Sequence, residues 1–281
     1  MLALGASHVA QNSDPSHTAQ ALKHRVAAMK LVKELLARPA KTLADGDALF
    51  GTLAILTCQS ALIPDAMVEY MTLTRGANLV ATAIMPDMNK SLFKDFAPER
   101  HTLILTRLVS EQPGDLDHIA GFRSSVRRLE PLCRTPSEVL YVGALLQIPD
   151  VLERSSSEGE EVCVPWRTPL RLTRCTAWLH FSALFLIPTH FSNDEWAAFS
   201  HEDNHVGQLL LLHMFLLDYV LGSFMIDPSL APKCPGRKNV VISWVEKVAS
   251  RLPPHLTSCA EWPASYCGVL SSREARHLFS P

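Results

Sequence analysis

The stretch from Val206 to Ile226, VGQLLLLHMFLLDYVLGSFMI, is apolar on nearly every side of a helix. A helix of this kind lies either in the core of a protein or in a membrane. The run contains Gln208, His213 and Asp218, and an aspartate at a bilayer centre costs about 2.5–3.5 kcal/mol on insertion scales. No lysine or arginine directly flanks it. We therefore predict a helix buried in protein, and not an integral membrane protein.

Most of the remaining chain has apolar residues three and four positions apart, the spacing of amphipathic helices. The weakest signal covers residues 85–113, where HTLILTRLV fits a helix or a strand. We predict an all-α fold: one domain over 1–281, of roughly ten helices, with an internal apolar cavity. A polar, flexible loop at 155–162 would join an N-terminal half, 1–154, to a C-terminal half, 163–281. Helices are expected near 15–37, 44–62, 66–85, 115–132, 136–152, 168–186, 204–226 and 240–252.

Composition excludes several classes of function. Hydrophobic residues make up 47% of the chain and charged residues 19%, and the net charge of -2 provides no basic field for nucleic acid. Phosphate-binding glycine motifs and the G-x-S-x-G elbow do not occur, so neither a nucleotide cofactor nor a serine nucleophile is indicated. The 7 cysteines are widely spaced without C-x-x-C, which favours a reducing, intracellular compartment.

The letters His201-Glu202-Asp203-Asn204-His205 form H-E-x-x-H, a zinc-peptidase signature. Zinc would need both histidines on one helix face and a third ligand, but neither a further histidine nor a glutamate follows at a suitable distance. Ser200 and Asp203 also match a capping box, and Asp203 or Asn204 could itself be the N-cap. We therefore expect the entrance to a helix here and no metal site.

Other polar residues in apolar segments leave alternatives open. His213 lies five residues before Asp218 and could serve acid–base chemistry, but a buried histidine bonded to a hydroxyl or carbonyl is the commoner case. The basic run Arg123, Arg127 and Arg128 fits a solvated helix face better than a nucleic-acid contact. Methionines and aromatics on apolar helices are typical of core and also of cavities for apolar ligands.

Three groups of residues, in order along the chain, resemble the C-terminal regulatory domain of fungal zinc-cluster (Zn2Cys6) transcription factors of the sterol uptake control protein type. The first comprises A-x-x-H-R at Ala21–Arg25, L-T-x-Q-S at Leu56–Ser60, and Asp65, Met67, Glu69, Tyr70, Arg75 and Gly76. The second is V-G-Q-L-L at Val206–Leu210 with His213. The third is Trp244, Pro254, His255, Trp262 and Pro263.

This resemblance implies a helical domain with an apolar cavity that binds a sterol and controls nuclear entry and transcription; loss of the ligand would release the factor to the nucleus. The six-cysteine DNA-binding cluster of the family is missing from this sequence, so a truncated product, a dissected domain, or a protein that discarded DNA binding is expected. We expect no direct contact with nucleic acid, and action through protein partners or a homodimer in the nucleus and cytoplasm.

The leading hypothesis is a ligand-sensing regulatory domain for a sterol, lipid or terpenoid, acting by a shift between helix packings. The alternative is an apolar-pocket cyclase or isomerase of fungal secondary metabolism, with His213, Asp218 or Glu69 transferring protons. A dimerisation remnant is a third possibility. Candidate ligand-binding residues, chosen for size and helix face, are Tyr70, Met71, Trp178, Phe181, His213, Met214 and Leu217.

Overall fold

The computed structural model describes residues 1–39, 41–110, 117–157, 169–226 and 235–272. These residues form twelve α-helices and no extended strand, which confirms the all-α prediction. The segment whose letters fit a helix or a strand is helical, as α5, Pro98–Leu108. Directly after it, Val109 forms an isolated antiparallel bridge with Ile226. The described chain divides into two compact units, Met1–His101 and Thr102–Ser280, and α5 contains the point of division.

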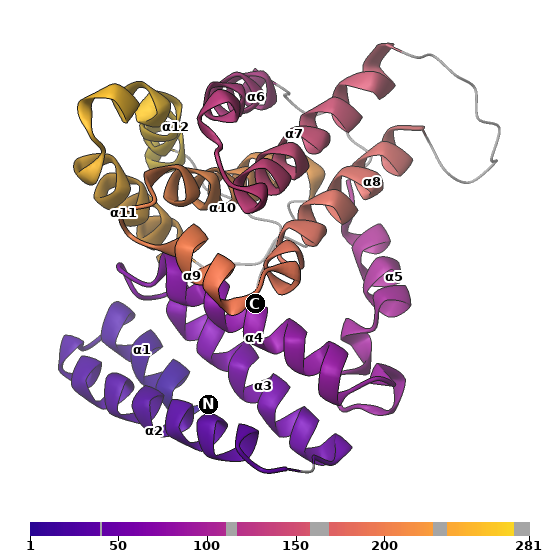
Figure 1. The fold of residues 1–281 in the computed structure, drawn as a ribbon, viewed down its shortest axis with the longest axis vertical. Coiled ribbons are helices and arrows are strands. Elements are labelled where there is room, and N and C mark those ends of the chain that lie inside the picture. The colour runs from indigo at the N-terminus through magenta and orange to yellow at the C-terminus, as the bar shows by residue number, and fades with distance from the viewer. Residues whose placement is uncertain (40, 111–116, 158–168, 227–234, 273–281) are drawn as a thin grey trace. The chain divides into compact units, whose positions relative to one another are not determined.

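The first unit contains four helices, drawn in indigo to purple in Figure 1. Their packing follows from an apolar face on α3 and α4, which lie side by side around a buried core that includes Leu49, Leu53 and Leu73. A capping box at Thr42 and Asp45 begins α3. Helices α1 and α2 pack against each other and against α3. The helices are α1 Leu2–Asn12, α2 Thr18–Leu36, α3 Leu43–Ser60 and α4 Met67–Ile84.

The second unit is built around α10, His205–Met225, which contacts α6, α7, α8, α9, α11 and α12. Within it α7 and α8 run side by side (Figure 1). Besides α5 and α10, the helices are α6 Asp117–Leu129, α7 Pro136–Ser157, α8 Pro169–Leu184, α9 Asn193–Ser200, α11 Pro235–Arg251 and α12 Glu261–Ser272.

Helix α10 is long and apolar enough to cross a membrane by length and composition alone. In this structure 94% of its apolar window is buried inside the protein, as in the core helix of a globular domain. The predicted range 204–226 is nearly that observed.

Besides α5, three helices lie outside the ranges predicted from the apolar spacing: α1, α9 and α12. Ser192 and Glu195 form a capping box that begins α9. The predicted loop at 155–162 is only partly described, because Ser155–Ser157 end α7 and residues 158–162 lie outside the described ranges.

Candidate functional site

The predicted ligand-binding residues fall in two groups. Tyr70 and Met71 lie on α4 in the first unit, and both are buried. The other five are buried in the second unit, on α8 and α10, which contact each other: Trp178, Phe181, His213, Met214 and Leu217. The structure therefore brings the second group onto one pair of helices, and that pair is the candidate site.

Helix α8 contains two buried polar atoms without a hydrogen-bond partner among the described residues. The indole Nε1 of Trp178 and the Oγ of Ser182, one helical turn later, are buried and have no hydrogen-bond partner among the described residues. The other buried side chains described on α8 are Arg174, whose Nη1 donates to the Ser110 carbonyl at 2.7 Å, and the apolar Ala177, Phe181 and Leu184. Buried polar atoms almost always have a partner. On the described part of α8, these two atoms are therefore exceptions to that rule.

His213 on α10 is fully buried and hydrogen-bonded through both ring nitrogens. Nδ1 lies 2.7 Å from the carbonyl oxygen of Leu209, and Nε2 lies 2.8 Å from the Oγ of Ser125. Burial lowers the pKa of His213 to about 4, against a smaller raising effect of the Leu209 carbonyl. The ring is therefore neutral at physiological pH, so Nδ1–H donates to Leu209 and Nε2 accepts from Ser125. The imidazole ring stacks on the indole of Trp262, with 5.7 Å between the ring centroids.

Met214 and Leu217 contribute apolar surface in the core of α10. The hydroxyl of Tyr141, on α7, donates to the Sδ of Met214 at 3.0 Å, and both residues are fully buried. Burial raises the pKa of Tyr141, so its phenol stays protonated and keeps donating. Leu217 is also fully buried.

Asp218 forms a buried ion pair with Arg237 of α11, Oδ2 to Nη1, at 2.6 Å. The guanidinium also lies 5.6 Å from the centre of the Tyr219 ring, within the range of a cation–π contact. Nothing in the sequence around Arg237 indicates this pairing. Asp218, considered for proton transfer in the alternative hypothesis, is thus held by a permanent positive charge.

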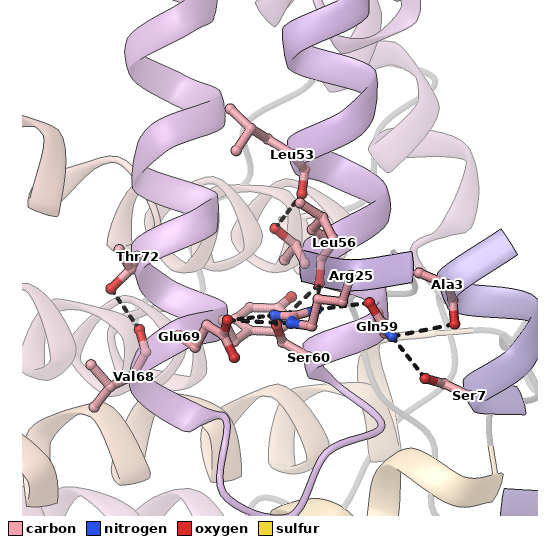
Figure 2. A network of polar contacts seen from close by, with 12 residues as sticks. Ala3, Ser7, Arg25, Leu53, Leu56, Gln59, Ser60, Val68, Glu69 and Thr72 are labelled. Carbon is pink, nitrogen blue, oxygen red and sulfur yellow. Dashed lines mark hydrogen bonds and ion pairs between the residues drawn. The ribbon is translucent and has the colours of Figure 1, made fainter. Parts of the chain in front are cut away.

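Glu69, the third proton-transfer candidate, belongs to a polar network in the first unit, shown in Figure 2. Its Oε1 pairs with Nη2 of the buried Arg25 at 2.8 Å. The same guanidinium donates to the Gln59 Oε1 at 2.9 Å, to the Ser60 Oγ at 2.7 Å and to the Leu56 carbonyl at 3.1 Å. One side chain of α2 therefore bonds groups on α3 and α4.

Gln59 extends this network to α1. Its Nε2 donates to the Ser7 Oγ at 2.9 Å and to the Ala3 carbonyl at 3.2 Å (Figure 2). It also approaches the Ala21 carbonyl of α2 at 3.4 Å. Arg25, Gln59, Ser60 and Glu69, four residues that carry the family resemblance, thus meet at one point where all four helices of the unit are joined.

The H-E-x-x-H letters lie in the turn between α9 and α10. His201 follows the last residue of α9, and His205 is the first residue of α10. Asn204 is the N-cap, its side chain accepting from the Gly207 N–H at 2.9 Å. The predicted Ser200–Asp203 capping box is wrong, because Ser200 ends α9 and its Oγ donates to the Trp196 carbonyl. The two histidines therefore do not share a helix face.

The same turn depends on Gly207 and Gln208. A Cβ on Gly207 would lie 2.0 Å from the Phe199 carbonyl oxygen, so only glycine permits this approach of α9 to α10. The Gln208 Nε2 donates to the carbonyls of Ser200, at 2.7 Å, and His201, at 3.2 Å, which satisfies the end of α9. Gly207 and Gln208, two residues of the V-G-Q letters of the resemblance, thus fix the turn between α9 and α10.

Asn204 also joins this corner to α7. Its Nδ2 donates to the Glu138 Oε1 at 2.9 Å, and the other carboxylate oxygen accepts from the backbone N–H groups of Arg134 and Thr135. Burial alone would raise the pKa of Glu138, but these backbone bonds and the amide of Asn204 together lower it below its ordinary value. Glu138 is therefore a buried anion that caps α7.

The remaining candidate groups are engaged elsewhere. Arg123 pairs with Asp150 at 3.1 Å and with Glu153, and Arg128 pairs with Glu261 at 3.1 Å. Burial raises the pKa of Cys133 and of Cys267 to about 12, so both are protonated thiols near neutral pH. The described part of the chain holds no group of three or more His, Cys, Asp or Glu side chains arranged to bind a metal.

Comparisons of this chain with protein-family models, with curated proteins and with solved structures give no match.

Proposed function

We propose that this chain is a ligand-sensing regulatory domain of the kind found in fungal zinc-cluster transcription factors. It binds a largely apolar molecule, a sterol, another lipid or a terpenoid, in an internal cavity, and it acts through protein partners in the nucleus and cytoplasm. Ligand binding shifts the equilibrium between two helix packings, and one of them presents the partner surface.

The observation that carries this proposal is the pair Trp178 Nε1 and Ser182 Oγ. A buried N–H and a buried hydroxyl, neither bonded to a described residue, lie one helical turn apart on α8, near the buried apolar side chains of Ala177, Phe181 and Leu184. A sterol carries one hydroxyl on an apolar skeleton. The indole N–H and the serine hydroxyl, one helical turn apart, would both hydrogen-bond that hydroxyl. Phe181, Met214 and Leu217 would then contact the skeleton.

The convergence of the motif residues supports the same assignment. Arg25, Gln59, Ser60 and Glu69 join the helices of one unit, and Gly207 with Gln208 fixes a corner in the other. Residues with such roles determine a fold, so their combined presence argues for the fold of the regulatory domain. The proton-transfer candidates His213, Asp218 and Glu69 are each engaged in a structural contact, which favours the regulatory domain over the enzyme.

The test is sterol binding by the full chain, measured by native mass spectrometry of protein purified from a fungal host and by the thermal shift with ergosterol. We expect a co-purifying lipid near one equivalent and a rise in melting temperature. Trp178→Phe and Ser182→Ala should each weaken binding about tenfold, since each removes a hydrogen bond worth about 1–1.5 kcal/mol.

Ser223→Ala is the matched control, because the Ser223 Oγ already bonds the Val220 carbonyl in its own helix and should leave sterol affinity unchanged. If an ordered water satisfies Trp178 and Ser182, both test variants will also leave affinity unchanged, and the polar anchor is refuted. An empty protein with no sterol-dependent thermal shift would refute the function itself.

A further inference from the structure

Helix α2 exposes a row of apolar side chains to solvent. Leu22 is 47% exposed, Val26 65%, Met29 42% and Leu36 45%. With Lys33 they occupy positions 22, 26, 29, 33 and 36, an alternation of four and three residues that places all five on one line along the helix. We call these five residues the α2 stripe. Single exposed apolar residues are ordinary, but several of them aligned along one helix mark an interaction surface.

The α2 stripe has the register of a coiled-coil seam. Leu22, Met29 and Leu36 are seven residues apart and occupy d positions, and Val26 and Lys33 occupy a positions. Lys23 and Lys30, both exposed, each follow a d residue and occupy e positions beside the seam. Glu34 is the only acidic residue of α2. The surface is thus a narrow apolar row with lysines within it and along one side.

A separate row of side chains attaches α2 to its own unit. Ala21 and Arg25 are buried, and Arg25 bonds α3 and α4 through the network of Figure 2. The network therefore holds α2 through residues that are not part of the α2 stripe. Its contacts do not compete with a partner that binds the stripe.

We propose that the α2 stripe is the docking surface for an amphipathic helix of a partner protein, with acidic residues at the positions beside its apolar seam. This inference rests on the proposed function, because it names the class of protein partner through which the domain would act. A helix of this kind inserts leucine-type side chains into the stripe and places carboxylates against Lys23, Lys30 and Lys33.

Charge excludes a second copy of the chain as the occupant. In a parallel pair of α2 helices, Lys33 would face its own copy at an a position. In an antiparallel pair, the e positions of the two copies, Lys23 and Lys30, would face each other. Like charges in contact disfavour both arrangements.

The width of the stripe favours a helix over a membrane. A helix that lies in a membrane surface needs a broad apolar face, commonly with tryptophan or phenylalanine. The α2 stripe is one seam wide and contains no aromatic residue.

The test measures binding of the full chain, without sterol, to two designed helical peptides of about three heptads. Both have isoleucine at a and leucine at d; one has glutamate at every e and g position, and the other has lysine there. We expect the glutamate peptide alone to bind, and Lys23→Glu with Lys30→Glu to weaken it at least tenfold and to permit binding of the lysine peptide. Both substitutions are on exposed positions, so the fold is kept.

Val26→Glu and Leu31→Glu form the matched pair of controls for the apolar row. Both residues are 65% exposed on α2, but Leu31 is five residues past Val26 and lies off the stripe. Val26→Glu should abolish binding of the glutamate peptide, and Leu31→Glu should leave it unchanged. Equal effects of the two variants would overturn the proposal.

Two further results would also overturn it: a stripe-dependent dimer by sedimentation, or binding to vesicles of phosphatidylserine and phosphatidylcholine with no peptide binding. Because the assay contains no sterol, a failure of sterol binding leaves this inference intact, and a failure here leaves sterol binding intact.

Discussion

Arg237 on α11 and Asp218 on α10 form an ion pair in which Nη1 and Oδ2 are 2.6 Å apart and each side chain is 1% exposed. Leaving one buried charge without its partner costs about 3–5 kcal/mol, whereas replacing both by apolar residues of similar volume is far less costly. We expect Asp218→Leu and Arg237→Met each to destabilise the protein by about that amount, and the double variant to recover most of the loss.

Tryptophan fluorescence during urea unfolding measures the unfolding free energy of these variants, because all 5 tryptophans lie beyond residue 165, in the second unit. The control is the exposed pair of Arg251 and Glu202, at 3.2 Å, whose removal should cost less than about 1 kcal/mol. Strictly additive losses for Asp218 and Arg237 would show that they do not interact.

Gly207→Ala should destabilise the second unit by several kcal/mol, because the new Cβ would meet the Phe199 carbonyl oxygen at 2.0 Å and force α9 away from α10. Gly143→Ala is the matched control: this glycine is exposed within α7 and has no atom within 4 Å of the added Cβ. There alanine should stabilise by up to about 1 kcal/mol, since it is the better helix former. A melting temperature that is equal in the two variants would contradict the close approach.

The corner at α9–α10 shows how far the sequence alone can lead. The apolar run predicts α10 almost to its ends, because a long buried helix needs no tertiary partner to be recognised. The N-cap, by contrast, is resolved only by the structure, since Ser200, Asp203 and Asn204 all have capping side chains and the choice depends on where α9 ends. Helix α9 itself lies outside the predicted ranges although its capping box, Ser192 with Glu195, is visible in the letters.

The candidate site is predictable only in part. Size and helix face select Trp178 and Phe181, and both are buried on α8. They do not select Ser182 and Arg237. Ser182 is of interest because its buried Oγ has no hydrogen-bond partner among the described residues, and Arg237 because it pairs with a carboxylate on another helix. Both properties arise from tertiary packing, and local sequence patterns do not encode them.

Asn204→Asp should be destabilising although aspartate is ordinarily as good an N-cap as asparagine. The change keeps the acceptor for the Gly207 N–H but removes the amide that donates to Glu138, and it places a second carboxylate beside a buried one. We expect a loss of about 1–3 kcal/mol at neutral pH. The loss should shrink as pH falls and one carboxylate of the pair becomes protonated.

Asn204→Ser separates charge from hydrogen bonding at this position, because serine caps a helix without adding a negative charge. Its cost should also shrink as pH falls, because the lost amide lowers the pKa of Glu138, but it should shrink less than that of Asn204→Asp, which adds a second carboxylate. If the aspartate and serine variants show the same pH dependence of unfolding free energy, the carboxylate introduced by Asn204→Asp does not repel that of Glu138.

His213 should make the protein less stable in acid. The folded pKa is lowered from 6.5 to about 4 by burial, so between these values the unfolded chain binds a proton that the folded protein does not. Stability contributed by this group is therefore full above pH 6.5 and falls as pH falls toward 4. The whole loss is on the order of 3 kcal/mol.

The measurement is the unfolding free energy of wild type and of His213→Gln, which does not titrate, across this pH range. The difference between the two proteins should narrow as pH falls from 6.5 to 4. His255→Gln removes an exposed histidine and should leave the pH dependence of the wild type unchanged. A constant difference between wild type and His213→Gln would mean that the imidazole titrates normally in the folded state.

Arg25→Lys should destabilise the first unit by about 2–3 kcal/mol, although the positive charge is kept. Lysine can pair with Glu69, but a single ammonium group cannot also reach the Gln59 Oε1, the Ser60 Oγ and the Leu56 carbonyl as the guanidinium does. Because Gln59 in turn bonds Ser7 and Ala3, the backbone amides of α1 should exchange with solvent faster in the variant.

Arg38→Lys is the control, since Arg38 is exposed and lies 3.8 Å from Asp45. Hydrogen exchange with mass spectrometry distinguishes the cases: α1 should be less protected in Arg25→Lys only, and equal protection of α1 in both variants would show that the network does not attach this helix.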